Sequence, residues 1–284
     1  MDIVTRMPQI GEIQALRHIW RSAFGAADEA AFFSYYYAPE FCITAVCDGL
    51  PVAAGYLLPS GQLVCGGQSV PCAMVYGVAA LPGYRSRGFG AAVTRELISL
   101  GRRAGFEAVA LCPSSDRLFE YYGSRTQLRD WFYVRERRLT ISPGPNPAKL
   151  VKIPAQEYAQ LREGFLSDIP HIKPDLRAVE YQNLLCREFG GGLFKVELHD
   201  GVSCAAVEIQ PNGQVCVKEL LTPDGCQRRV LSAIAAAFPV GEYIVRTPAR
   251  RRSKYCRRFG MLAASPALPD ALNRSLPWFG LAFD

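Results

Sequence analysis

The sequence is poor in histidine and has no paired cysteines. Its 284 residues include three histidines, His18, His171 and His199, and none of them stands at a metal-ligand spacing from another. None of the ten cysteines belongs to a Cys-x-x-Cys pair. Zinc sites draw on closely spaced Cys and His ligands, so the sequence gives no indication of a metal.

Long uninterrupted apolar runs are also missing. No stretch reaches the roughly 20 apolar residues of a membrane-spanning helix. The chain opens with Met1-Asp2 and has no basic start followed by an apolar segment, which is the pattern of a signal peptide. Cysteines such as Cys42 and Cys204 stand in apolar, strand-like runs, where a free thiol behaves as a small hydrophobic side chain. We therefore expect a cytoplasmic protein with reduced cysteines and no membrane partner.

Neither sign of charge is in large excess. The chain carries 32 Lys and Arg against 26 Asp and Glu, a net charge of +6. Residues 1–141 contain no lysine, and their 14 arginines face 12 acidic residues. So mild an excess does not by itself imply a nucleic-acid partner. Hydrophobic residues make up 49% of the chain, which is typical of a globular protein with a substantial core.

A proline-rich segment divides the chain. Residues 142–148, Ser-Pro-Gly-Pro-Asn-Pro-Ala, cannot form a helix or a central strand and are typical of an extended linker. The sequence therefore predicts one domain at residues 1–141, a linker at 142–148 and a second domain at 149–284. Both domains have ordinary lengths.

Hydrophobic periodicity predicts the same order of elements in both parts. The first part is expected to contain helices at 9–24 and from 28, a hairpin of 41–47 with 51–58, strands at 70–80, 108–112 and 131–139, and helices at 90–104 and 116–122. The second part is expected to contain helices at 155–166, 175–189, 227–238 and 250–258, a hairpin of 193–198 with 202–209, strands at 214–221 and 243–246, and two final strands around 266–269. This repetition indicates two related domains, each an α/β (α+β) fold with a mixed sheet.

Residues 75–91 are the most informative segment. An apolar strand ends near Leu81, a turn follows, and Arg85-x-x-Gly88-x-Gly90 leads directly into a helix. Helix-start amides lack partners within the helix, and glycines let an anion approach the backbone. The spacing is neither the Gly-x-Gly-x-x-Gly of dinucleotide sites nor the Gly-Lys-Ser/Thr of P-loops. The segment therefore predicts a different kind of phosphate site.

The segment closely resembles the acetyl-CoA pyrophosphate loop of the GNAT superfamily of N-acetyltransferases. That family's strand, Pro-x-Tyr-Arg, two residues, Gly-x-Gly and helix are matched by Pro82, Tyr84, Arg85, Gly88 and Gly90. The resemblance implies two tandem GNAT-like domains, acetyl-CoA as co-substrate, and transfer of acetyl to an amine of a small-molecule or peptide acceptor. The implied cofactor-binding residues are Tyr76, Val78, Ala80, Arg85, Ser86, Arg87, Gly88, Phe89, Gly90 and Ala91.

The resemblance also implies a tyrosine that protonates the departing thiolate, on the short helix at 116–122. Matching the Tyr-Tyr pair directly makes Tyr122 the first candidate and Tyr121 the second. Counting back from Gly123 lands on Phe119 instead, which has no proton to give. Aligning the second part on the first around Tyr255 supports the match that makes Tyr122 the candidate.

The general base and the acceptor site are less well defined. The strand at 70–80 carries no Asp or Glu, which leaves Glu40, Glu120 or a chain of waters. Some tandem GNAT-like enzymes use their C-terminal carboxylate, and Asp284 follows an apolar segment that could be buried. The aromatic run at 32–37 lies where the family often places its acceptor; it could cage a cation, or it could pack into the core.

The second part lacks the glycine loop. Thr-Pro-Asp-Gly-Cys-Gln-Arg-Arg precedes its helix, so we expect a degenerate copy that binds no acetyl-CoA and instead covers the first domain, shapes the cleft or forms a homodimer. The basic segment at 250–258 is expected to be a solvated helix face or a phosphate contact. Two other functions stay open: a non-catalytic acyl-CoA-binding module, and an acyltransferase that uses aminoacyl-tRNA.

Overall fold

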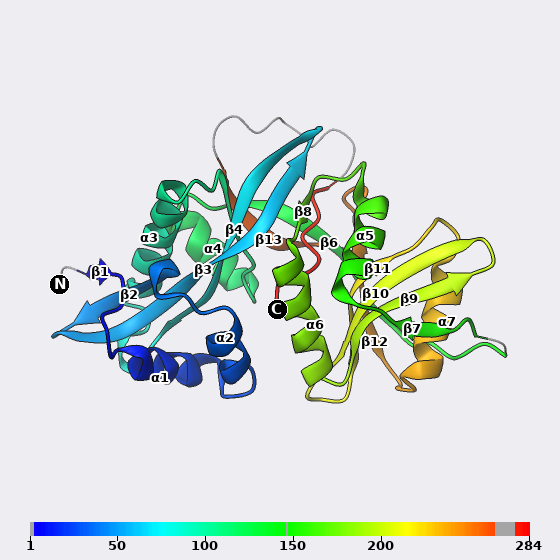
Figure 1. Cartoon of the computed structure of the whole chain (residues 1–284), viewed down its shortest axis with the longest axis horizontal. Coiled ribbons are helices and arrows are strands. Elements are labelled where there is room, and N and C mark those ends of the chain that lie inside the picture. The colour runs from blue at the N-terminus through cyan, green and yellow to red at the C-terminus, as the bar shows by residue number, and fades with distance from the viewer. Residues whose placement is uncertain (1–2, 146, 265–275) are drawn as a thin grey trace. The chain divides into compact units, whose positions relative to one another are not determined.

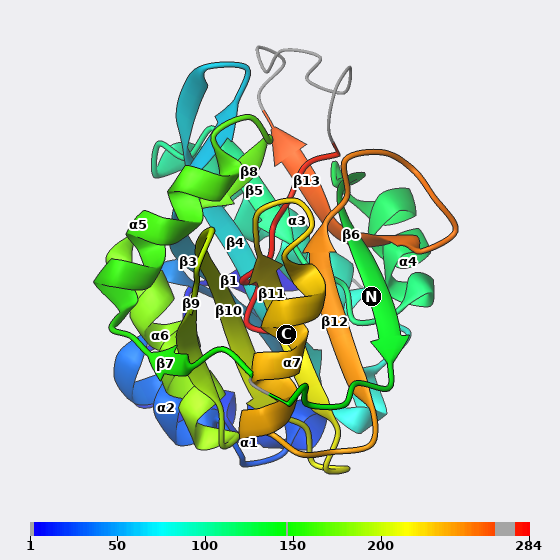
Figure 2. The same cartoon turned by 90° about the vertical axis from the view of Figure 1, so that its right-hand side faces the viewer.

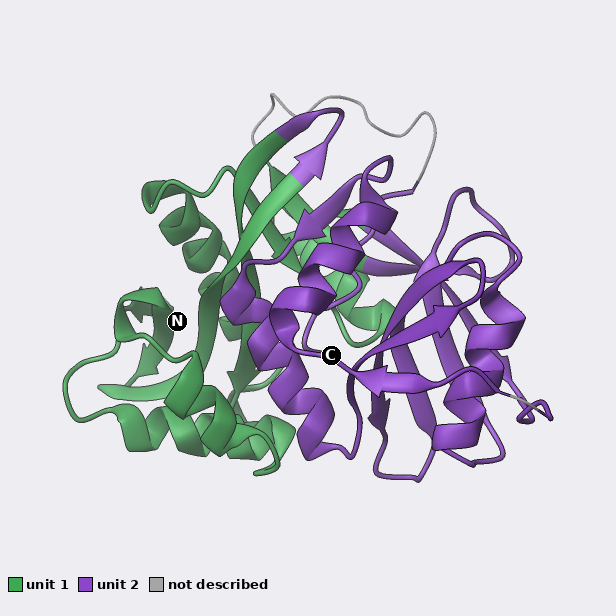
Figure 3. Cartoon of the chain, turned by 45° about the vertical axis from the view of Figure 1, so that its right-hand side comes forward, with its two compact units in different colours: residues 1–63, 69–131, 260–268 green, residues 64–68, 132–259, 269–284 purple. Residues whose placement is uncertain are grey.

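Residues 3–145, 147–264 and 276–284 are described by a computed structural model of the chain (Figure 1). The chain divides into two units, coloured separately in Figure 3. The first comprises residues 1–63, 69–131 and 260–268, and the second comprises residues 64–68, 132–259 and 269–284. Within the described ranges, no helix combines the length and the apolar character that a membrane span requires.

The first unit is a mixed sheet with helices on both faces. Its strands follow the order β1-β2-β3-β4-β5-β13, in which β4 and β5 are parallel while β2 and β3 are antiparallel. The elements in this part of the chain are β1 (Val4–Arg6), α1 (Ile13–Phe24), α2 (Glu29–Tyr35), η1 (Pro39–Phe41), β2 (Cys42–Cys47), β3 (Leu50–Cys65), β4 (Gln68–Ala80), η2 (Pro82–Tyr84), α3 (Phe89–Arg103), β5 (Ala108–Leu111) and α4 (Asp116–Arg125).

Two apolar layers hold this sheet. On one face, Val93 and Leu97 of α3 pack with strand residues such as Ala73 and Val109. On the other face, Trp20 of α1 stacks on Phe32 of α2, with ring centroids 4.4 Å apart. The alternation of side chains along β4 and β5 supplies both layers, because successive residues of a strand point to opposite faces.

The second unit has the same kind of architecture. Its strands follow the order β6-β12-β11-β10-β9-β7, with β11 and β12 parallel. In Figure 2, α7 crosses the face formed by β10, β11 and β12. The elements here are β6 (Arg129–Leu139), β7 (Leu150–Lys152), α5 (Ala155–Leu166), β8 (His171–Lys173), α6 (Leu176–Glu188), β9 (Gly192–Leu198), β10 (Gly201–Ile209), β11 (Val215–Leu221), α7 (Gln227–Ala237), β12 (Tyr243–Pro248) and β13 (Cys256–Ala264).

The last strand of the first unit comes from the far end of the chain. Met261 of β13 lies opposite Leu111 of β5, and Ala264 lies opposite Ala108, in an antiparallel register. This short strand has a neighbour on each edge, β4 and β13, and all four of its residues are buried. The predicted boundary at residues 142–148 lies within the second unit, whose longest segment runs from Phe132 to Phe259.

The predicted mixed α/β fold is confirmed, and most predicted elements are present. Both hairpins form, with left-handed backbone at Asp48 and Gly49 in the first. The helix predicted at 250–258 is wrong, because residues 250–255 form no helix or strand and β13 begins at Cys256. The strands predicted around 266–269 lie outside the described residues. The ten cysteines are free thiols.

Candidate active site

The turn from β4 into α3 forms a helix start whose first backbone amides have no partner within the helix. Gly88, the residue before α3, has a left-handed backbone with φ of +89°, which is readily available only to glycine. The first bond within the helix runs from the Ala92 amide to the Gly88 carbonyl, at 3.0 Å. The amides of residues 89–91 thus have no partner within the helix, and together with the helix dipole they favour an anion.

Ser86 gives this turn a strained backbone. Its φ is +62°, although it carries a side chain and is exposed to solvent. A left-handed conformation costs a residue with a Cβ roughly 1–2 kcal/mol. Such strain collects at ligand sites, where the surrounding structure fixes an unfavourable backbone for a purpose.

The Tyr121 hydroxyl reaches the same helix start from α4. The Ala91 amide donates to the Tyr121 oxygen at 2.9 Å, and a Cβ built on Gly90 would lie 3.4 Å from that oxygen. A phenol oxygen that accepts a hydrogen bond still has its own proton to donate. The fold therefore places a proton donor beside the predicted phosphate amides.

Tyr122 and Phe119 lie instead in the apolar core of the first unit. Tyr122 is 6% exposed and Phe119 is 3% exposed, and both belong to the cluster under α3. Burial raises the pKa of Tyr122, whose hydroxyl forms a hydrogen bond with Thr94. The repeat register that favoured Tyr122 assumed a helix at residues 250–258, which the structure does not have.

The two loop arginines differ in their contacts. Arg85 donates from Nε to the Ala80 carbonyl at 3.2 Å and from Nη2 to the Ser22 carbonyl at 2.9 Å. It therefore ties the loop to the end of β4 and to α1. Arg87 is exposed, with its guanidinium carbon 5.6 Å from the centroid of the Tyr84 ring, and leaves its charge beside the loop.

The second half of β4 extends past its neighbour. The parallel register between β4 and β5 ends at Val75 opposite Leu111, whereas β4 continues to Ala80. The predicted positions Tyr76, Val78 and Ala80 are all partly exposed along this stretch. The register with β5 ends before these positions, so an extended ligand could pair along Val78 and Ala80 as an added strand.

Gly77 lies at the start of this extension. Its φ is +58°, and a Cβ there would lie 2.6 Å from a ring carbon of Trp20. Glycine is needed both for the left-handed backbone and for the close approach of the strand to the indole ring. The resulting irregularity turns β4 just where its register with β5 ends.

The aromatic run forms core rather than an open cage. Phe32, Phe33 and Tyr36 are 0, 7 and 3% exposed, and the rings of Phe32 and Phe33 contact Trp20. The interpretation of these three side chains as core is confirmed. The Tyr56 hydroxyl and the Trp20 Nε1 atom lie buried in this region without a hydrogen-bond partner among the described residues.

A buried carboxylate in this region was not among the candidates. Within the described part of the first unit, Glu29 of α2 is 4% exposed and is held by Arg17 at 2.9 Å and by Arg21. The Arg21 hydrogen bond, with that of Arg17, holds the pKa of Glu29 below its usual range. The spacing of four residues between the two arginines on α1 was the available signal. Glu40 and Glu120 are exposed.

Asp284 is anchored within the second unit. Its side chain pairs with Arg246 at 2.6 Å and with Lys218 at 3.6 Å, and Lys218 also donates to its main-chain oxygen. Burial alone would raise the pKa of Asp284, but the two cations hold it well below its ordinary value. Its proposed role as a base stays a prediction; so low a pKa makes the side-chain carboxylate a weak proton acceptor.

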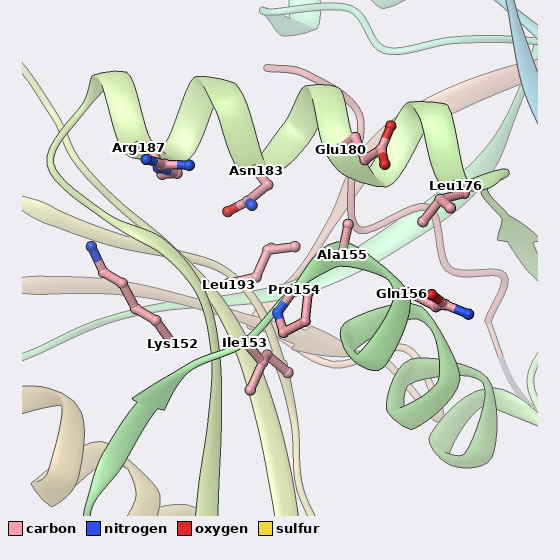
Figure 4. Close-up of a pocket in the computed structure, with 10 residues that line it drawn as sticks. All are labelled: Lys152, Ile153, Pro154, Ala155, Gln156, Leu176, Glu180, Asn183, Arg187 and Leu193. Atoms are coloured by element: carbon pink, nitrogen blue, oxygen red, sulfur yellow. The ribbon is translucent and has the colours of Figure 1, made fainter.

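The described part of the second unit contains cavities of a size that suits small molecules. One, of about 560 Å³, lies between α6 and the segment from β7 to α5, with Lys152 and Arg187 toward one end and Glu180 and Gln156 toward the other (Figure 4). Another, of about 520 Å³, lies at the ends of β11 and β12 and the start of α7. The loop predicted to be degenerate, residues 222–226, contributes Thr222 and Gly225 to this second cavity.

Comparison with known proteins agrees with this geometry. Residues 5–126 match the family described as Acetyltransferase (GNAT) domain. A GCN5-related N-acetyltransferase from Kribbella flavida is 18% identical, with a TM-score of 0.65 over 93% of this chain and 71% of that one. An enzyme of the same description from Anabaena variabilis is 15% identical, with a TM-score of 0.66 over 93% and 73%. A putative acetyltransferase from Pyrococcus horikoshii is 15% identical, with a TM-score of 0.54 over 98% and 95%. No curated protein sequence matches the chain.

Proposed function

Since the chain is an acyltransferase with a GNAT domain at residues 5–126, we propose that it transfers acetyl from acetyl-CoA to an amine. The observation that carries this proposal is the start of α3, where Gly88 turns the chain and the amides of residues 89–91 have no partner within the helix. The GNAT family binds acetyl-CoA, and its pyrophosphate suits such a helix start. Arg87 adds an exposed positive charge.

In the reaction, carbon–nitrogen and sulfur–hydrogen bonds form while carbon–sulfur and nitrogen–hydrogen bonds break. The amine nitrogen attacks the thioester carbonyl carbon and gives up a proton to a base or to water, the carbon–sulfur bond breaks, and the departing thiolate takes a proton. We assign that proton to Tyr121, because its side chain is partly exposed beside the loop, whereas that of Tyr122 lies in the apolar core. A backbone amide near Val78 is the candidate for stabilising the carbonyl oxygen as charge develops on it.

The same geometry favours tandem GNAT-like domains. Both units place two parallel strands side by side, β4 with β5 and β11 with β12, and in both a helix follows the first strand of the pair. We propose that the first unit carries catalysis. The acceptor is an amine of a small molecule or a peptide, and its identity is left to an amine-library assay.

Calorimetric titration of the full chain with acetyl-CoA tests the proposal. We expect one micromolar site, lost in Gly88→Glu and Gly90→Glu, because each introduces a negative side chain at the helix start. Gly83→Glu is the matched control: it adds the same charge in the same loop, at a position where a Cβ meets nothing within 4 Å. Binding that survives both helix-start variants would contradict the proposed site. Binding without turnover on any amine would favour a non-catalytic acyl-CoA-binding module.

A further inference from the structure

The cavity of about 520 Å³ in the second unit has the elements of a ligand site of its own. It is separate in sequence from the glycine loop, and all its lining residues fall between Arg135 and Tyr255. Cavities of several hundred Å³ are the size in which proteins bind small molecules. The proposed acetyl transfer assigns no role to this one.

The cavity lies where two parallel strands part. The register of β11 with β12 ends at Val217 opposite Val245, whereas the strands continue to Leu221 and Pro248, both of which line the cavity. In open α/β sheets, ligands bind beyond the carboxyl ends of parallel strands. The position corresponds to the end of β4 in the first unit.

The start of α7 adds backbone amides that have no partner within the helix. Its preceding residue, Cys226, makes no side-chain cap, and the first amide to bond back within this turn is that of Arg229, at 3.0 Å from the Cys226 carbonyl. The amides of Gln227 and Arg228 precede it, and Gln227 lines the cavity. These amides lie at the N-terminus of an 11-residue helix, which is the positive end of the helix dipole.

Arginines without acidic partners face the same space. Arg135 of β6 and Arg251 both line the cavity, and neither has a carboxylate within 4.0 Å in the described part of the chain. Arg250 pairs with the exposed carboxylate of Asp224, which also lines the cavity, at 3.9 Å. Unpaired guanidinium groups offer several donors in a planar fork that matches phosphate oxygens.

An aromatic ring completes the lining. Tyr255 is 42% exposed, and the guanidinium carbon of Arg135 lies 6.0 Å from its centroid. Arg137 and Lys254 also lie over this ring, at 5.4 and 5.2 Å from its centroid, so a base would stack on Tyr255 by displacing one of these flexible cations.

We infer that this cavity binds a small phosphate-bearing ligand of the nucleotide class. Parting parallel strands, helix-start amides and unpaired arginines all favour a phosphate, and Tyr255 favours an attached base. The loop lacks the glycine pair of residues 88 and 90, so the site is not a copy of the first one. The inference does not depend on acetyl transfer by the first unit.

Calorimetry of the full chain with ADP tests this inference, with pyrophosphate as the probe for phosphate alone. We expect one ADP site whose affinity falls at least tenfold in Arg135→Ala/Arg251→Ala and in Arg251→Glu. Arg251 is exposed, so the second variant is expected to fold, which circular dichroism will verify. Arg138→Ala is the control, because Arg138 is an exposed arginine of the same strand that pairs with Glu242 outside the cavity.

Arg87→Ala distinguishes ADP bound in the cavity from ADP bound at the glycine loop, since this variant weakens only a site at the glycine loop. ADP binding that is kept in Arg87→Ala and lost in Arg251→Glu supports the inference, and CoA that displaces this ADP would identify CoA as the source of the phosphate. No ADP binding at millimolar concentration would overturn the inference. ADP binding that is unchanged in both cavity variants, or that is lost only in Arg87→Ala, would also overturn the inference.

Discussion

The Tyr121 hydroxyl and the Tyr122 hydroxyl are adjacent in sequence but lie in different surroundings. The Tyr121 hydroxyl accepts a hydrogen bond from the Ala91 amide at the helix start, whereas the Tyr122 hydroxyl forms a hydrogen bond with Thr94 in the apolar core. Adjacent helix residues differ by about 100° around the axis, so a helix cannot present both to one site. Sequence matching could name the pair, but only packing of α4 on α3 separates its members.

Tyr121→Phe is predicted to lower turnover about 10²-fold while acetyl-CoA affinity stays within a few fold, because it removes a proton donor and leaves the loop intact. The matched change, Tyr122→Phe, is expected to leave turnover nearly unaltered. Steady-state kinetics with calorimetry measures both. The reverse result would restore Tyr122 as the acid, and a loss of affinity alone would assign Tyr121 to phosphate binding.

Tyr56→Phe is predicted to stabilise the chain by about 1 kcal/mol. Its hydroxyl is buried without a partner among the described residues, and burying an unpaired polar group is unfavourable. Urea unfolding followed by tryptophan fluorescence measures the change. Tyr36→Phe is the control, because that hydroxyl donates to the Pro59 carbonyl at 3.0 Å and its loss should destabilise by a similar amount. A destabilised Tyr56→Phe would mean that the hydroxyl has a partner in solution.

At the scale of elements, the last nine residues behave as a packed segment although they form no helix or named strand. Trp278 and Phe279 are 0 and 2% exposed. Trp278 donates from Nε1 to the buried carboxylate of Glu219 at 2.5 Å, and Arg162 holds the same carboxylate at 3.0 Å. A buried charge needs such partners, so the segment and the ion pair depend on each other.

The cations around Asp284 predict a pH dependence for this segment. The pKa of Asp284 is lower in the folded chain than in the unfolded chain. The stabilising effect of its carboxylate is therefore complete above about pH 4 and is lost as the pH falls further. Asp284→Asn should therefore lower the unfolding temperature at pH 7. At pH 3.5, the difference in unfolding temperature between this variant and the unaltered chain should be smaller. Scanning calorimetry at both values checks this. Asp168→Asn is the control, an exposed carboxylate without an ion pair among the described residues; equal gaps at both pH values would contradict the prediction.

At the scale of the whole molecule, the first unit is not a continuous piece of chain. The GNAT match ends at residue 126, yet residues 260–264 supply the strand next to β5. Val109 and Leu111 of β5 are buried, so removing β13 would leave a hydrophobic strand with an open edge. The chain beyond residue 131 is thus needed to complete the sheet that precedes it.

A fragment of residues 1–131 is predicted to aggregate, because its β5 edge would be exposed. Appending residues 256–264 through a Gly/Ser linker should recover a monomer, since it restores the antiparallel partner. Size-exclusion chromatography and circular dichroism compare the two fragments. A fragment of residues 1–131 that is monomeric and unfolds cooperatively would show that β13 is dispensable.

The sequence alone determined the features that depend on neighbouring residues. Gly88 before an apolar-periodic helix, and Asp48-Gly49 between two apolar strands, are set by local backbone preferences, and both appear where they were predicted. The tertiary structure decided what depends on distant partners. Tyr121 meets Ala91, β13 meets β5, and Arg135 shares a cavity with Arg251. No local pattern encodes these contacts, because they arise only when sheets and helices pack and bring remote side chains together.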